Sequence, residues 1–258
     1  MSDLFSSFMS VFAELVEHIA DAVEPLFHGS ATAAAIVLFT ACVRLLVHPL
    51  SRAAARGQKA RAKLSPQIAE LRKKHAKNPD RMQKAILELH AKEKVSPLSG
   101  CLPSLLQLPA FFLLYHLFSS SSIGGEANAL LGHTLFAAPL GDRWTDALGE
   151  GGVFGAQGFV YLALFAVVAA VATFNYRRTK QQMAATPQAG GNGDPQVPGM
   201  GAMMKVMPLM SFMTLITVAV VPLAAALYVV TSTTWSAVER AFLYRDVPAG
   251  AAALATGV

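Results

Sequence analysis

The sequence has little charge and little cysteine for its length. Only 14% of its 258 residues are charged, against about a quarter in soluble domains, while 53% are hydrophobic and the mean hydropathy is +0.44. The two cysteines, Cys42 and Cys101, lie in apolar segments, and we expect both to be small buried hydrophobic residues. These scarcities exclude a disulfide scaffold and intrinsic disorder and argue against a water-soluble enzyme. They leave a single polytopic membrane domain as the predicted class.

Motifs of nucleotide binding and catalysis are also missing. The chain has no glycine-rich phosphate loop ending in Lys-Ser or Lys-Thr, no His-Glu-x-x-His and no Gly-x-Ser-x-Gly. Its seven histidines are scattered without the spacing of metal ligands. We therefore expect no enzymatic activity, no cofactor and no metal site.

Five apolar segments are long enough, or nearly so, to cross a membrane. A membrane helix needs about 20 mostly apolar residues, with a lower limit near 17. The sequence thus predicts an all-α polytopic membrane protein with five transmembrane helices. The predicted spans are residues 30–51, 97–120, 157–177, 205–221 and 222–243.

The placement of charge orients these spans, because cytoplasmic loops of membrane proteins are rich in Lys and Arg. The loop from Arg52 to Ser96 holds 13 of the 21 Lys and Arg residues and four acids, so it should be cytoplasmic. The segment before the first span has five acids and no Lys or Arg, and the loop 121–156 has four acids and one Arg. Both should lie outside. The prediction is an N-terminus outside, and a flexible loop at 178–204 and a short tail at 244–258 in the cytoplasm.

Two segments outside the spans have helical character. Residues 1–29 predict an amphipathic helix along the outer membrane surface. Its apolar residues at helical spacing are Leu4, Phe8, Val11, Phe12, Leu15, Ile19, Val23 and Leu26. Residues 52–96 predict a basic helical hairpin, with a helix start at Ser65-Pro66 and a break at Asn78-Pro79-Asp80. Its basic surface could bind anionic lipids, ribosomal RNA or acidic partners, or could only set the orientation.

Arg44 is the most informative residue, because it lies inside the first predicted span. A charged residue there costs roughly 2.5 to 3.5 kcal/mol on insertion scales and normally faces a protein interior or a water-filled cavity. The alternative is that its long side chain extends to the cytoplasmic headgroups. We expect no carboxylate inside the spans to neutralise it.

Other polar side chains could line the same cavity, although Ser and Thr in membrane helices often only join helices or bond their own backbone. The candidates are Gln107, Ser211, Thr214, Tyr228, Thr231 and Ser232. Methionines cluster at the start of the fourth span, where their flexible side chains could accept variable apolar clients or simply pack.

Three stretches carry a resemblance to a known family. They are Val43-Arg44-Leu45-Leu46-Val47-His48-Pro49-Leu50, Ser96-Pro97-Leu98-Ser99-Gly100-Cys101-Leu102-Pro103-Ser104-Leu105-Leu106-Gln107-Leu108-Pro109, and the closing run from Pro222 to Trp235 followed by Phe242-Leu243-Tyr244-Arg245. Together they resemble the YidC membrane protein insertase family over residues 31–245. Where the family usually has a glycine, this chain has Ala224.

The resemblance implies a five-helix core around a hydrophilic groove that opens to the cytosol and to lipid. Arg44 would supply the charge of the groove and Gln107 part of its polar lining. Spans two and four would form a slide for client helices, with Leu105, Phe111, Met207 and Met210 as the candidate contacts.

The partners implied are nascent membrane proteins, with the ribosome, the signal recognition pathway, the secretory translocon and anionic lipids as further candidates. No specific nucleic acid is expected. The implied location is the bacterial plasma membrane. Two other functions stay open: a small transporter or anion channel with Arg44 as its selectivity charge, and a scaffold that recruits a partner through the basic hairpin.

Overall fold

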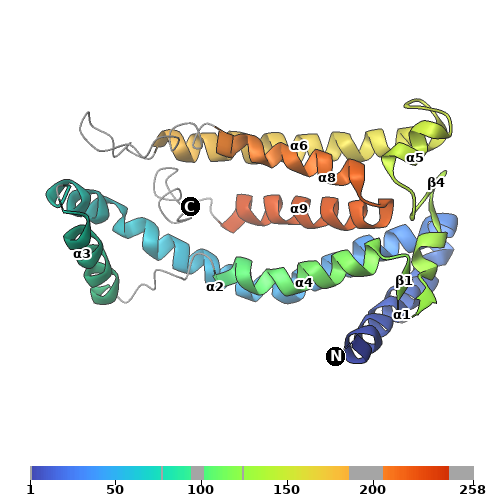
Figure 1. Ribbon diagram of the computed structural model, residues 1–258, viewed down its shortest axis with the longest axis horizontal. Coiled ribbons are helices and arrows are strands. Elements are labelled where there is room, and N and C mark those ends of the chain that lie inside the picture. Colours follow the sequence, from blue (N-terminus) through green and yellow to red (C-terminus); the bar gives the residue numbers. More distant parts are fainter. Residues whose placement is uncertain (1, 77, 94–101, 124, 186–205, 244–258) are drawn as a thin grey trace. The chain divides into compact units, whose positions relative to one another are not determined.

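The computed structural model describes residues 2–76, 78–93, 102–123, 125–185 and 206–243, and these residues are mostly helical (Figure 1). They form two compact units. Unit 1 comprises Met1–Leu46, Leu108–Thr173 and Phe212–Ala237, and unit 2 comprises Val47–Gln107, Phe174–Ser211 and Val238–Val258. Cys101 lies outside the described residues, and Cys42 is exposed, so the expectation that Cys42 is buried was wrong. A thiol is small and apolar enough to face lipid as readily as a core.

The α-helices among the described residues include both apolar segments and polar ones such as α3 (Pro79–Lys92). They are α1 (Ser2–Phe27), α2 (Ala31–Lys74), α3 (Pro79–Lys92), α4 (Leu102–Ser119), α5 (Trp144–Gly149), α6 (Ala156–Ala185), α8 (Met213–Val220) and α9 (Leu223–Leu243). The 3-10 helices are η1 (His28–Ser30), η2 (Ala129–Gly132) and η3 (Met207–Phe212). Two stretches, Met9–Leu64 and Ala156–Gln181, are long and apolar enough to cross a membrane by length and composition, and Pro208–Val220 is a shorter apolar helix.

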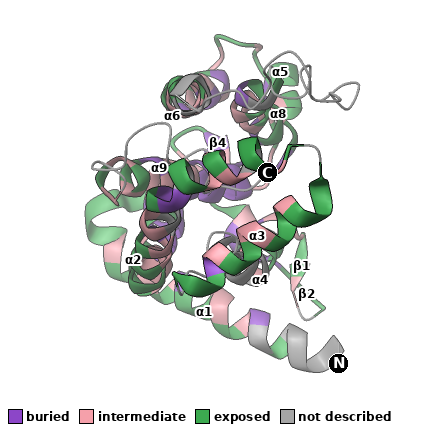
Figure 2. Cartoon of the chain, turned by 90° about the vertical axis from the view of Figure 1, so that its left-hand side faces the viewer, coloured by how far each residue is buried: buried purple, intermediate pink, exposed green. Residues whose placement is uncertain are grey.

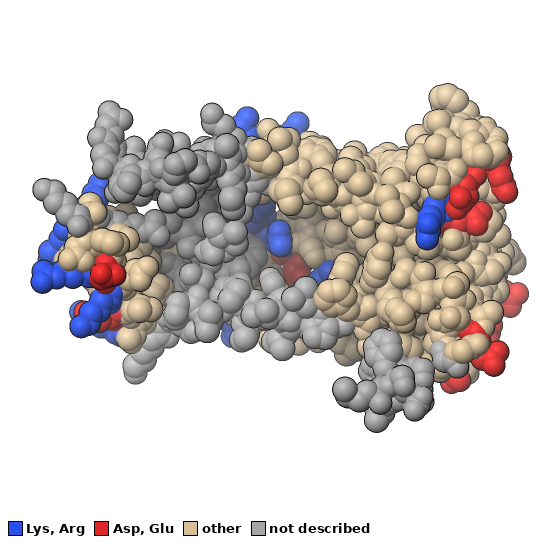
Figure 3. Space-filling model, in the orientation of Figure 1, with Lys and Arg blue, Asp and Glu red and all other residues tan. Residues whose placement is uncertain are grey.

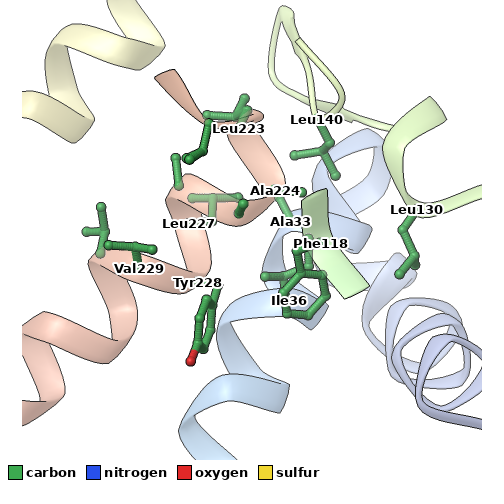
Figure 4. Packing of buried hydrophobic residues seen from close by; sticks show 14 of the residues in the cluster. Ala33, Ile36, Phe118, Leu130, Leu140, Leu223, Ala224, Leu227, Tyr228 and Val229 are labelled. Atoms are coloured by element: carbon green, nitrogen blue, oxygen red, sulfur yellow. The ribbon is translucent and has the colours of Figure 1, made fainter. Parts of the chain in front are cut away.

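The core of unit 1 is built around the first half of α9. Residues from Leu223 to Val230 are all buried, and three of them in a row are alanines, which let neighbouring helices approach closely. In this unit α9 lies between α6 and α8 on one side and α2 and α4 on the other (Figures 1 and 2). Figure 4 shows Ala33 and Ile36 of α2 and Phe118 of α4 packed around it.

The loop between α4 and α6 closes one end of this core with hydrogen bonds. The Asn128 side chain donates to the carbonyls of Leu117 (2.8 Å) and Ser120 (2.9 Å) at the end of α4. The backbone N–H groups of Leu223 and Ala224, which begin α9, donate to the carbonyls of Asp142 (2.8 Å) and Leu140 (2.9 Å). The loop thereby satisfies backbone groups that helix ends leave unpaired.

Short strands in this loop were not predicted from sequence. Strands β1 (Ser122–Ile123) and β2 (Glu126–Ala127) pair antiparallel, as do β3 (Thr134–Leu135) and β4 (Ala138–Pro139). Two residues are too few to show the alternation of a strand in the sequence. The loop ends close to the backbone of α6, where a Cβ on Gly158 would lie 2.3 Å from the carbonyl oxygen of Val153.

α1 packs on the core with a face that overlaps the predicted stripe only in part. Met9, Val16 and Ala20 are buried, and Phe12 and Ile19 of the predicted stripe pack against the same core. Val11 and Leu15 of the stripe are exposed. The helix therefore has apolar residues on two sides, one turned to the protein and one turned away from it.

In unit 2, α2 continues through Pro49 and Pro66 to Lys74. The predicted helix start at Ser65-Pro66 was therefore wrong, since a proline can be tolerated inside a helix at the loss of one backbone hydrogen bond. The predicted break at Asn78-Pro79 is confirmed: the Asn78 side chain accepts from the N–H of Arg81 (3.0 Å) and Pro79 begins α3.

The fourth predicted span is not a continuous α-helix. Its described part consists of the 3-10 helix η3, which contains Pro208, followed by the eight residues of α8. Proline lacks a backbone donor, and tight 3-10 geometry is common where an α-helix begins or is interrupted.

Charge is divided between the two units. Unit 1 contains nine acidic residues and only two Lys or Arg residues, Arg44 and Arg143, whereas unit 2 contains nineteen Lys or Arg residues and seven acids. Figure 3 shows the acids of unit 1 gathered over α1 and α5, and blue side chains of unit 2 around α3.

Candidate functional site

Arg44 contacts α9 in unit 1. The residue is half-buried on α2, and its Nη2 donates a hydrogen bond to the hydroxyl of Ser232, whose side chain is buried on α9. The bond joins residues 188 positions apart in the chain. The guanidinium is thus directed toward a neighbouring helix of the protein, the arrangement expected of a charged residue that faces an interior.

Two further hydroxyls are buried near this contact or on the same helix. The hydroxyl of Tyr228, one turn before Ser232, lies within electrostatic reach of Arg44 and Ser232 and meets no partner at full hydrogen-bond geometry among the described residues. The hydroxyl of Thr234, also on α9, is buried and likewise has no hydrogen-bond partner among the described residues. Because buried polar groups are normally hydrogen-bonded, both hydroxyls could bond water or a polar group that enters the site.

The other predicted lining residues are distributed over both units. Thr231 is half-buried on α9 and Thr214 is half-buried on α8, both in unit 1. Ser211 is half-buried in η3 and belongs to unit 2, as does Gln107, whose side chain lies outside the described part. Of the predicted polar residues, Ser232 and Tyr228 are thus the ones that the described contacts place beside Arg44.

The predicted slide residues have different surroundings. The ring of Phe111 packs on Tyr115 (5.8 Å between centroids) and on Tyr228 (6.0 Å), so it supports the side chain next to Arg44. Met210 is 60% exposed in η3. The side chains of Leu105 and Met207 lie outside the described part.

A carboxylate inside the fifth predicted span was missed. Glu239 lies on α9, and its Oε1 accepts a hydrogen bond from Nδ1 of His48 on α2 at 2.6 Å. The expectation of no acid within the spans was therefore wrong. The signal was available, because Glu239 falls within 222–243 and the polar faces of a helix repeat every three or four residues.

The loop at the start of α9 contains an acid in an unfavourable setting. Partial burial raises the pKa of the Asp142 carboxyl above its ordinary value of 3.8, and the nearby charges of Asp146 and Glu150 raise it further. The backbone carbonyl of the same residue accepts from Leu223 (2.8 Å) and from the hydroxyl of Tyr161 (2.7 Å). The ionised side chain thus destabilises a loop that its backbone helps to hold.

Asp142→Asn should flatten the pH dependence of this loop. With a folded-state pKa above 3.8, the wild-type free energy of unfolding should rise as the pH falls from neutral toward 3.8 and Asp142 becomes protonated. The variant should lack that rise and be the more stable protein at neutral pH. Thermal unfolding followed by the fluorescence of Trp144 in a Trp235→Phe background measures both effects. Identical pH profiles for the two proteins would contradict the assignment.

Together, these features define an all-α membrane protein in which an arginine of one apolar helix bonds a serine of another. The chain belongs to the 60Kd inner membrane protein family, whose model matches residues 24–250.

Individual relatives match over shorter stretches. A protein of Magnetococcus marinus named membrane protein insertase YidC is 44% identical over 81 residues, which cover 31% of this chain and 15% of that protein. Proteins of the same name from Clostridium perfringens and Geobacter metallireducens are 38% identical over 91 residues and 41% identical over 81. Those matches cover 35% and 31% of this chain, and 38% and 15% of the relatives. The chain thus matches well under half the length of each.

Proposed function

We infer that the protein is a membrane protein insertase of the bacterial plasma membrane that works without nucleotide hydrolysis. Its clients are nascent membrane proteins. The family membership and the names of the relatives support this function, and the contact between Arg44 and Ser232 is the observation on this chain that carries it.

The proposed topology has five spans with the N-terminus outside and the C-terminus in the cytoplasm. The spans are residues 30–51, 97–120, 157–177, 205–221 and 222–243. The charge difference between the units supports this orientation, because unit 1 has a large excess of acids and unit 2 a large excess of Lys and Arg. The loop 121–156 and α1 then lie outside, and α3 lies in the cytoplasm.

In the proposed mechanism, a polar and often acidic segment of the client enters a hydrophilic groove that contains Arg44. The positive charge attracts the segment more strongly than it would in water, because the surroundings have a lower dielectric constant. Hydroxyls such as those of Tyr228 and Ser232 lower the cost of holding a polar backbone at membrane depth. The apolar part of the client then partitions into lipid, driven by roughly 25 cal/mol per Å² of apolar area removed from water.

The cytoplasmic hairpin of α3 and the end of α2 is proposed to receive clients and to contact anionic lipids. Its candidate partners are the ribosome, the signal recognition pathway and the secretory translocon. The described Lys and Arg residues on it are mostly exposed, so they are available to acidic surfaces.

Site-specific photocrosslinking to a stalled nascent chain tests this function. A crosslinker in place of Ser232 or Gln107 should capture the polar segment of a client, and one in place of the exposed Ile216 on α8 should capture its apolar segment or lipid. Absence of client crosslinks at the first two positions would contradict the proposal. Solute or ion flux through liposomes that contain this protein alone would favour a transporter or channel.

A further inference from the structure

The pair formed by His48 and Glu239 is a contact in the described part of unit 2 to which the proposed mechanism gives no role. The two side chains approach to 2.6 Å from α2 and α9, and they differ in access to solvent: His48 is 37% exposed and Glu239 only 11%. The histidine thus occupies one oxygen of a largely buried carboxylate. A carboxylate in an apolar helix is costly, and such residues usually have a function.

Glu239 differs from the other described acids of unit 2. Those are Glu70, Asp80, Glu88 and Glu93, and all four are exposed. Exposed carboxylates bind cations weakly because water and salt screen them, whereas a largely buried carboxylate is screened much less. Unit 2 holds nineteen Lys or Arg residues against seven acids, so its net charge repels a cationic ligand, whereas the carboxylate of Glu239 attracts one.

We propose that Glu239 binds the Lys or Arg residue that flanks a client's apolar segment on the cytoplasmic side, with His48 as the partner that this cation displaces. The proposal rests on the insertase function and adds a second charge site to it. Arg44 attracts the acidic segment that crosses, and Glu239 holds the basic residue that stays behind.

The chemistry favours this exchange. An imidazole gives Glu239 a single N–H, whereas an ammonium group offers three donors and a guanidinium five, each with a permanent positive charge. Hydrogen bonds between two ionised groups are shorter and stronger than those between neutral groups. Clients that keep Lys or Arg on the cytoplasmic side would therefore be held in the orientation that membrane proteins generally adopt.

The alternative is that the pair only clasps α2 to α9, and two substitutions separate these roles. Glu239→Gln removes the negative charge and keeps the shape of the side chain. His48→Ala removes the partner of Oε1 and keeps the carboxylate. A clasp requires both partners, so both variants would be impaired alike; a cation site requires Glu239 alone.

The test uses the full chain in phosphatidylcholine vesicles, whose lipids carry no net charge. Two clients share one apolar segment and have either two Lys or two Gln residues at its cytoplasmic end, and the insertion rate of each is measured by protease protection. Glu239→Gln should lower the ratio of the Lys-client rate to the Gln-client rate by about tenfold. His48→Ala should keep or raise this ratio.

An unchanged ratio in Glu239→Gln, or an equal fall of the ratio in both variants, would overturn the cation site and leave the insertase function standing. If the wild-type protein inserts neither the Lys client nor the Gln client, both proposals are overturned together.

Discussion

Replacing Arg44 with glutamate is expected to abolish insertion of clients whose translocated segment is acidic. The change turns attraction into repulsion at the site, and two unit charges about 4 Å apart interact by about 4 kcal/mol at an effective dielectric constant of 20. Since about 1.4 kcal/mol corresponds to a tenfold change, insertion should fall by more than about tenfold. The measurement is the inserted fraction of an acidic client at matched amounts of wild-type and variant protein in the membrane.

Two controls make this result specific to the site. Arg52→Glu makes the same charge change two turns further along α2, at an exposed position, and should reduce insertion far less. A client with a neutral translocated segment should be affected less by Arg44→Glu than an acidic one. Normal insertion of the acidic client by Arg44→Glu would refute the proposed role of this residue.

Deleting residues 66–94, with a short Gly-Ser linker in their place, should impair the reception of clients more than the stability of the membrane core. In the part of α2 that belongs to unit 2, the buried residues are Ala55, Ala62 and Leu64, and all three precede the deletion. Most residues of α3 are exposed. Residues with few buried contacts contribute little to global stability. We expect at least a severalfold loss of client insertion.

Thermal unfolding of the deleted protein in detergent should stay close to that of the wild type, which would separate reception from folding. A matched control replaces the same segment by a neutral helical hairpin of equal length. Rescue by this neutral hairpin would show that length matters and the basic charge does not. Insertion at the full rate without any hairpin would mean that the segment serves only as a topology signal.

The class of the protein follows from composition, and the reason is physical. Long apolar segments with few charges are typical of chains that lie in lipid. Because lipid offers no hydrogen-bond partners, the backbone groups must bond one another within helices, so an all-α membrane protein is the expected result. The break before α3 was equally predictable, because Asn78 and Pro79 determine a helix start locally. The number of spans rests on the apolar segments and their orientation on the placement of charge, and both remain predictions.

The contacts at the site could be predicted only in part. Arg44 and Ser232 were both candidates, and the structure places them in one hydrogen bond. Ser232 could not be chosen over Ser211 or Thr214 from the sequence, since the choice depends on how each helix is rotated about its axis. Glu239 lies inside the predicted span 222–243, but its contact with His48 depends on how α2 and α9 face each other, which the sequence does not show.

Local geometry that depends on distant partners was the least predictable. The two small hairpins between α4 and α6 are held by Asn128 and by the start of α9, and such bonds leave no periodic pattern in the sequence. The division of the fourth span into η3 and α8 was also hidden, because hydropathy does not distinguish a 3-10 helix from an α-helix.

The central claim, that Arg44 lies in a groove that water enters from the cytoplasm, is tested most directly by labelling a cysteine beside it. Thr231→Cys, in a background with Cys42 and Cys101 replaced by serine, keeps both Arg44 and Ser232. A membrane-impermeant maleimide reacts with thiolates, which form only where water is present. We predict labelling at residue 231 from the cytoplasmic side and none at Ile216→Cys, which is exposed on the apolar helix α8. The account would be contradicted if the impermeant maleimide labelled neither position and residue 231 reacted only with a lipid-soluble maleimide.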